Sequence, residues 1–286
     1  MNWNQLKYRY KVLSVAEKLI VLNVLCFVIP FVLQTILYLF QISNGVLLNW
    51  VQLSSNWEAL IFRPWTLVTY SFLHTGFFHL FWNMILLYYS GQLFLNLFSS
   101  KTFSNVYFMG VVLGGLVFVL SYNLFPVFQG MRPFMVGASA GVMAVFIFIS
   151  TYSPDQQVRF FFFNISLKYL ALAFVILDII QIPNGNAGGH LAHLGGAYLG
   201  FLYARQLQKG KDIGSGWERF WDGLGQWLRP RPKVKKVYKN PKKTKRGTQA
   251  VDQQKIDAIL DKISKSGYDS LSKEEKDTLF RAGNNS

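Results

Sequence analysis

Hydrophobic residues gather in six runs within the first 206 positions, and polar or glycine-rich stretches separate these runs. A helix needs about 20 predominantly apolar residues to cross roughly 30 Å of hydrocarbon. The runs therefore predict transmembrane helices, of which the fourth is short. The expected spans are 19–40, 78–98, 104–124, 139–153, 162–181 and 190–206.

The remainder of the chain is polar and predicts three features. Aromatic residues and leucines recur at spacings of three and four over 217–228, which predicts an amphipathic helix at a membrane interface. Residues 229–246 contain ten basic residues, three prolines and no acidic residue. We expect a disordered tether near anionic lipid headgroups there, with nucleic-acid binding as the alternative. Beyond it, an apolar face that ends at Gly267 and the capping-box spacing of Ser272 and Glu275 predict a small helical hairpin.

Composition supports a membrane protein. Of the 286 residues, 51% are hydrophobic and only 15% are charged, against about a quarter in soluble domains, which disfavours a soluble enzyme. Four basic residues precede the first run and 14 lie between Arg205 and Arg246, so the positive-inside rule puts both termini in the cytoplasm. We read the net charge of +15 first as this cytoplasmic bias, and expect contacts with membrane lipids and not with nucleic acid.

These patterns predict an all-α, integral multi-pass protein of a bacterial inner membrane. The single cysteine, Cys26, excludes a disulfide framework within the chain and leaves any metal site to histidine and carboxylate. We expect no cofactor and no bound metal. The expected parts are a cytoplasmic N-terminal segment (1–18), a six-helix membrane domain (19–206), an interfacial helix with a cytoplasmic basic linker (207–250) and a C-terminal helical hairpin (251–286).

Polar residues at the outer ends of the even-numbered spans form the candidate site. His79 and Asn83 lie near the start of the second span, Ser139 at the start of the fourth and His193 near the start of the sixth. Because these spans run in the same direction, the topology brings the four side chains to a similar depth below the outer surface. Polar groups are costly in hydrocarbon, so this convergence indicates a functional site.

The four residues match what acyl transfer requires: a nucleophile, a base and donors for a developing oxyanion. Ser139 has glycines on both sides, and its place in the first turn of a helix leaves backbone N–H groups free. His79 and Asn83 are four residues apart on one helix face, where both could donate to the same oxygen, which leaves His193 as the base. The plainer alternative is that Ser139 is a small residue at a helix contact.

Three motifs in these spans resemble those of the rhomboid family of intramembrane serine proteases, over roughly residues 60–205. The His-x-x-x-Asn motif is found at 79–83, the Gly-x-Ser motif at 137–139 and the Ala-His-x-x-Gly-x-x-x-Gly motif at 192–200. Any one of them alone is a weak signal. Their order and their positions on the expected spans make the match specific.

The resemblance implies a dyad of Ser139 and His193 without an acidic third member, and an oxyanion hole that includes His79, Asn83 and the Ser139 backbone N–H. It also implies a compact six-helix bundle with a water-filled cavity open to the outside. The implied substrates are transmembrane helices of other membrane proteins. Three glycines are expected to support the site by allowing close approach: Gly137, Gly196 and Gly200.

The sequence departs from the family pattern at two positions. The family often has Trp-Arg in its first loop, whereas Trp65 is followed here by Thr66, so an anchor of that loop is expected to differ. Members often have an aromatic residue one helical turn after the serine, and Met143 occupies that position here. Because a thioether can still contact an imidazole favourably, we expect weaker positioning of His193 and not its loss.

Three further residues and two further functions stay open at this point. His74 and His190 either contact the active site or are structural hydrogen-bonding residues. For Asp178, near the outer end of the fifth span, we favour interfacial hydration or helix packing, with orientation of an imidazole as the alternative. The competing functions are a catalytically silent rhomboid-like protein that binds membrane helices, and a metal-dependent hydrolase in which His190 and His193 chelate zinc.

Overall fold

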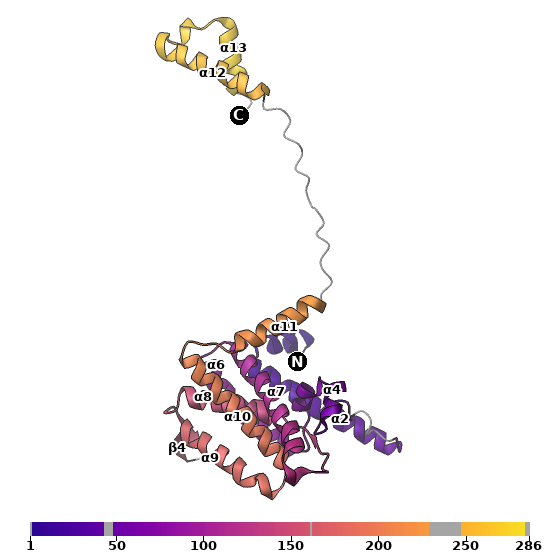
Figure 1. Cartoon of the computed structure of the whole chain (residues 1–286). Helices are drawn as coiled ribbons and strands as arrows, with labels where there is room; N and C mark the ends of the chain where they lie inside the picture. The colour runs from indigo at the N-terminus through magenta and orange to yellow at the C-terminus, as the bar shows by residue number, and fades with distance from the viewer. Residues whose placement is uncertain (1, 43–47, 161, 229–246, 284–286) are drawn as a thin grey trace. The chain divides into compact units, whose positions relative to one another are not determined.

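The computed structural model describes residues 2–42, 48–160, 162–228 and 247–283 (Figure 1). The chain forms two compact units, Met1–Arg229 and Pro230–Ser286. The basic tether predicted at 229–246 lies outside the described residues.

Six long helices of the first unit lie where the apolar runs predict helices. Within the part of the chain that the structure describes, three segments are long and apolar enough to cross a membrane, namely Val15–Leu39, Ser100–Leu124 and Leu167–Asn184, and the fourth helix is shorter, as expected. The short helix α1 (Trp3–Val12) precedes the six, and α11 (Gly214–Leu228) follows them. The six are α2 (Val15–Leu39), α6 (Phe77–Leu95), α7 (Ser100–Leu124), α8 (Ser139–Tyr152), α9 (Leu167–Gln181) and α10 (Ala187–Gln208).

The start of the fifth helix was predicted wrongly. The expected span begins at 162, but α9 begins at Leu167, after an antiparallel hairpin of β3 (Gln157–Phe160) and β4 (Phe163–Ser166). The stretch is rich in phenylalanine, and aromatic residues are as compatible with a strand as with an apolar helix. A second two-stranded sheet, of β1 (Leu53–Ser54) and β2 (Phe134–Met135), means that the chain is mostly helical and not all-α.

Side-chain caps fix where two of the helices begin. Ser14 Oγ accepts from the Glu17 N–H at 3.2 Å, while the Glu17 carboxylate accepts from the Ser14 N–H at 2.7 Å, which starts α2 with a capping box. Ser99 Oγ accepts from the Thr102 N–H at 3.1 Å at the start of α7. These bonds satisfy backbone donors that the first turn of a helix leaves unpaired.

The connection from α2 to α6 contains β1, α4 (Trp57–Phe62), α5 (Thr66–Thr69) and the 3-10 turn η1 (Tyr70–Phe72). Contacts of two indole rings anchor this connection. Trp65 Nε1 donates to the Trp50 carbonyl at 2.8 Å, and the two indole rings stack with centroids 6.0 Å apart. The Arg63 guanidinium lies 5.7 Å from the centre of the Trp50 ring. The short Thr66 side chain donates locally, to the Arg63 carbonyl at 2.7 Å.

Neighbouring helices surround the short helix α8. Every residue from Ala140 to Ser150 is buried, and α6, α7, α9 and α10 all contact the helix. Its polar side chain in this stretch is satisfied locally, because Ser150 Oγ donates to the Phe146 carbonyl at 2.7 Å. Neighbouring helices therefore enclose the middle of α8, and Ser139 lies at the amino-terminal edge of this buried stretch.

Glycines bring the backbones of α7, α8 and α10 into direct contact. A Cβ atom at Gly196 would overlap the Ala140 carbonyl oxygen, and one at Gly200 would overlap the Ala144 carbonyl oxygen. A Cβ atom at Gly114 of α7 would lie 2.7 Å from the Ala192 carbonyl oxygen. Small residues at such contacts are the usual means by which membrane helices pack closely. The expected supporting role of Gly196 and Gly200 in helix packing has this geometric basis.

The second unit consists of α12 (Gly247–Ser266), the 3-10 turn η4 (Tyr268–Ser270) and α13 (Lys273–Gly283). Gly267, with φ +78°, lies between α12 and the turn. The predicted capping box is present: the Ser272 N–H donates to Glu275 at 2.7 Å, and the Glu275 N–H donates to Ser272 Oγ at 3.3 Å. Lys262 of α12 pairs with Glu275 at 2.9 Å, which links the two helices.

Replacing Gly196 by alanine is expected to destabilise the bundle, because the methyl group would force α10 away from the Ala140 carbonyl. Overpacking of this kind costs about 1–3 kcal/mol. Gly216→Ala in α11 is the matched control, since a Cβ atom there meets nothing within 4 Å and alanine is the better helix former. Thermal unfolding in detergent should show a lower Tm for Gly196→Ala alone. Equal melting temperatures for the two variants would contradict the close contact.

Candidate active site

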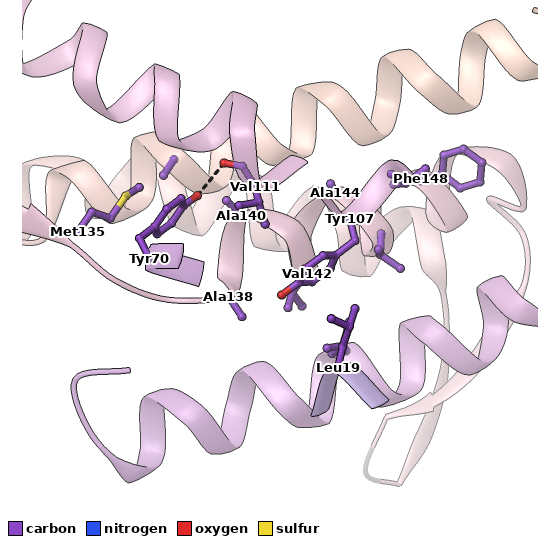
Figure 2. Close-up of a cluster of buried hydrophobic side chains, with 14 of the residues drawn as sticks. Leu19, Tyr70, Tyr107, Val111, Met135, Ala138, Ala140, Val142, Ala144 and Phe148 are labelled. Atoms are coloured by element: carbon purple, nitrogen blue, oxygen red, sulfur yellow. Dashed lines mark hydrogen bonds between the residues drawn. The ribbon is translucent and has the colours of Figure 1, made fainter. Parts of the chain in front are cut away.

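The loop that leads into Ser139 is held on two sides. Its strand β2 pairs with β1, with Leu53 opposite Met135. The Gly137 N–H then donates to the Tyr70 carbonyl at 3.0 Å. Tyr70 is itself buried, and its hydroxyl donates to the Val111 carbonyl of α7 at 2.8 Å (Figure 2). The start of α8 is therefore fixed relative to α7 and to the segment that precedes α6.

Gly137 faces both His79 and Ser139. Its φ of +133° is one that side-chain-bearing residues rarely adopt. A Cβ atom here would lie 2.9 Å from Cε1 and Nε2 of His79, and 3.5 Å from Ser139 Oγ. The imidazole edge and the hydroxyl therefore border the same small space. Glycine is required at 137 both for the backbone conformation and for this space.

His193 lies at the level of Ser139. Gly196 packs on Ala140 and Gly200 packs on Ala144, so α8 and α10 run in the same direction through their contact. His193 precedes Gly196 by one turn, which sets it beside the start of α8. His79 lies close enough to His193 for charges on the two rings to interact. Among the described residues, Ser139 Oγ and His193 form no direct hydrogen bond.

The side chains of α6 have partners that orient them. Thr75 Oγ1 lies 3.1 Å from Nδ1 of His79, so Nε2 is the ring nitrogen that faces Gly137. Asn83 is buried, and its Nδ2 donates to the His79 carbonyl at 2.8 Å within the same helix. An amide has two N–H donors, so one remains for a ligand. The sequence reasoning missed Thr75, although a hydroxyl four residues before a histidine at a helix start is a recognisable signal.

His74 packs behind His79. The two rings meet edge to face with centroids 5.1 Å apart. Both ring nitrogens of His74 are buried, and neither has a close hydrogen-bond partner among the residues that the structure describes. Burial, and then the neighbouring His79, lower the pKa of His74 to about 3. The ring is therefore neutral near pH 7 and acts on His79 by packing.

Asp178 of α9 joins the two histidines of α10. Its Oδ1 lies 2.8 Å from Nδ1 of His193 and 2.8 Å from Nδ1 of His190. The carboxylate is buried, with a side-chain exposure of 9%, so of the two environments that we favoured interfacial hydration is wrong, and Asp178 packs against α10 in contact with the imidazoles. The arrangement also departs from a dyad without an acidic neighbour. In the sequence, the signal for such a contact is a single carboxylate within an apolar run.

The same three residues have ligand types that suit a divalent metal. Their ligand atoms lie within 4.8 Å of one another, and imidazole with carboxylate is a common donor set for zinc. However, donors held at about 2.0 Å around a tetrahedral Zn²⁺ would be roughly 3.3 Å apart. The 2.8 Å between Oδ1 and each Nδ1 is instead an ordinary hydrogen-bond length. The observed spacing thus fits hydrogen bonding better than shared coordination.

Met143 is part of the core beneath the site. It is 3% exposed and belongs to a cluster with Phe146 of α8, Leu167 of α9 and Ala197 of α10. Its side chain therefore fills the junction of three helices. The effect of this residue on the positioning of His193 stays a prediction, but Asp178 gives His193 a contact that the family pattern does not supply.

Comparison with known proteins identifies two matching regions. Residues 62–209, about half of the chain, match the Rhomboid domain, and residues 246–282 match a family of unknown function, DUF6576. RHOMBOID-like protein 12, mitochondrial, from Arabidopsis thaliana is 30% identical over 162 residues, which are 52% of this chain and 48% of that protein. The chain thus spans about half the length of this relative. The Rhomboid match includes every residue of the candidate site.

Replacing Gly137 by alanine is expected to disable the site and to strain the backbone, because residues with a Cβ atom rarely adopt a φ of +133°. The Cβ atom would press on His79 and displace it from Ser139, and a misplacement of about 1 Å can cost about 10²-fold in rate. Gly130→Ala is the control, because Gly130 also has a positive φ, +82°, but nothing lies within 4 Å of its Cβ position. The measurement is the rate at which a fluorophosphonate labels Ser139. Similar rates for the two variants would show that the space beside His79 is unimportant.

Proposed function

The chain belongs to the rhomboid family, and on that premise we propose that it is an intramembrane serine protease that cleaves transmembrane helices of other membrane proteins. Ser139 is the nucleophile and His193 the general base. The main support for this proposal is that His79 and Ser139 border the same space beside Gly137. This space lies at the start of α8, next to the part of α10 that contains His193. A helix-packing serine would need neither the positive φ of Gly137 nor this neighbourhood.

The reaction follows from these positions. Ser139 Oγ attacks the carbonyl carbon of the scissile peptide bond while His193 removes the hydroxyl proton. The tetrahedral intermediate collapses, and His193 returns the proton to the leaving amine. A water molecule, activated by the same imidazole, then releases the acyl group from Ser139.

The start of α8 suits stabilisation of the oxyanion. Ala138 is the N-cap residue and makes no side-chain hydrogen bond, so it leaves the N–H groups of the first turn available. The positive end of the helix dipole points the same way. If the Thr75 hydroxyl donates to Nδ1 of His79, Nε2 carries the ring proton and becomes a donor. The second N–H of the Asn83 amide supplies a further donor.

The protein is an integral multi-pass membrane protein, and our proposal for its orientation keeps both termini in the cytoplasm of a bacterial cell. Under this proposal all six long helices cross the inner membrane, and the site opens outward. An ion pair supports the placement of α11 on the cytoplasmic side: Glu218 pairs with Lys101 at 2.6 Å, at the start of α7. Asn105 Nδ2 also donates to Glu218 at 2.7 Å. The relative's name refers to mitochondria, which is a statement about that protein alone.

A catalytically silent protein that binds membrane helices is the second candidate, because the rhomboid family includes inactive members. Such relatives generally lack the serine or the histidine. This chain has both, together with the glycine that keeps space beside them. Labelling of Ser139 by a serine-directed reagent, dependent on His193, distinguishes the two functions.

Ser139→Ala is expected to abolish cleavage of a transmembrane reporter by the purified protein, with a loss on the order of 10⁶ by analogy with soluble serine proteases. Ser150→Ala is the matched control, since Ser150 is a buried serine of the same helix whose Oγ is bonded to its own helix backbone. That control should retain near-normal turnover. Undiminished cleavage by Ser139→Ala would end the protease proposal in this form.

Asn83→Ala is expected to lower kcat by about 10²–10³-fold, the usual cost of one oxyanion donor. KM should change little, because the lost hydrogen bond forms only as charge develops on the oxygen. Steady-state kinetics on the reporter separate the two parameters. A rise in KM at unchanged kcat would instead assign Asn83 to substrate binding.

A further inference from the structure

We propose that Asp178 is a positioning residue that converts the Ser139–His193 pair into a triad, by holding His193 in the tautomer that can accept the serine proton. This inference rests on the proposed protease function. It adds to that function a third residue, on a third helix, on which the rate of peptide-bond cleavage depends.

Asp178 is unusual for the helix that carries it. Most of α9 is exposed on the surface of the unit, as expected for a helix that faces lipid, and its buried residues are Leu167 and Asp178. A carboxylate inside a membrane domain is costly, so its retention calls for partners. The two partners in the structure are the Nδ1 atoms of His190 and His193, each 2.8 Å from Oδ1.

The contact determines which nitrogen of His193 can act as a base. An ionised carboxylate only accepts hydrogen bonds, so Nδ1 of His193 must carry the ring proton. Nε2 is then unprotonated, and its lone pair is free to take the proton of Ser139. When His193 becomes an imidazolium, the adjacent negative charge stabilises it. This is the role of the acid in serine protease triads, reached here from the fifth helix of the bundle.

His190 has a supporting role in this arrangement. Its Nδ1 donates to the same oxygen, which uses a second lone pair of Oδ1 and restricts rotation of the carboxylate. The rings of His190 and His193 lie edge to face, with centroids 5.8 Å apart. Asp178 is thereby aimed at His193 by a residue one turn earlier on the same helix. His190 itself needs no contact with the substrate.

Asp178→Asn is the principal test. The amide keeps the size of the side chain but can present an N–H to Nδ1, which favours the tautomer with a proton on Nε2 and removes the base. In soluble serine proteases the equivalent change costs about 10⁴-fold. We expect kcat to fall by about 10²–10⁴-fold with KM within about threefold of wild type, and fluorophosphonate labelling of Ser139 to slow in parallel.

Asp155→Asn is the matched control. It is the same substitution in the turn between α8 and β3, where Asp155 pairs on the surface with Lys168 of α9 at 2.6 Å. Its kcat should equal that of the wild type. Tm values of both variants separate a loss of chemistry from a loss of folding.

A spectroscopic measurement on the wild-type protein keeps the test independent of how Asp178→Asn folds. The ¹⁵N chemical shifts of His193 should show a protonated Nδ1 and an unprotonated Nε2 near neutral pH. A proton on Nε2 in the wild type would overturn the inference. So would a kcat for Asp178→Asn within threefold of wild type while Ser139→Ala is inactive, which would leave the protease proposal intact.

Two other outcomes overturn the inference in distinguishable ways. Loss of activity on exhaustive chelation, restored by Zn²⁺, would make Asp178, His190 and His193 metal ligands. A wild-type protein that neither cleaves reporters nor labels at Ser139 would remove the protease proposal itself, whatever the state of Asp178.

Discussion

The contact between the backbones of α8 and α10 is the constraint on which the rest of the structure depends. Gly196 and Gly200 lie directly against carbonyl groups of α8, so no side chain separates the helix of Ser139 from the helix of His193 at these contacts. Backbone atoms in a packed interior cannot adjust as side-chain rotamers do. The separation of Ser139 and His193 is therefore set by the helices themselves, and α7 reinforces it through Gly114, which touches both Ala140 and Ala192.

Burial of α8 leaves one end of the helix for chemistry. From Ala140 to Ser150 its residues are buried, whereas Ser139 is partly exposed at the first turn. The same turn has unpaired backbone donors and the positive end of the helix dipole. The hydrogen bond from Gly137 to Tyr70 prevents the loop from moving independently of the core. One helix start thus provides both the proposed nucleophile and the proposed anion site, without any charged side chain on α8.

Topology and motif spacing were sufficient to predict which helices meet at the site, because three spans that run in the same direction must begin at the same depth. Hydropathy failed at 162–166, where phenylalanines are as apolar in β4 as they would be in a helix. Asp178 was assigned to the wrong environment for another reason. Whether it faces lipid, water or His193 depends on the rotation of α9 about its axis, and a nearly uniform apolar helix has no polar face from which that rotation can be read.

Asp178 also bears on the absence of an aromatic residue at 143. A ring stacked on an imidazole restricts its tilt but does not select which nitrogen carries the proton, whereas a carboxylate at Nδ1 does both. The cost is the free energy of burying a negative charge, and hydrogen bonds from two N–H donors lower this cost before the reaction. In the proposed mechanism, His193 becomes positive beside Asp178 as Ser139 loses its proton, and the new negative charge forms at the start of α8. The attraction between the buried carboxylate and His193 is therefore strongest while the oxyanion forms. An interaction that is stronger in the transition state than in the ground state accelerates the reaction.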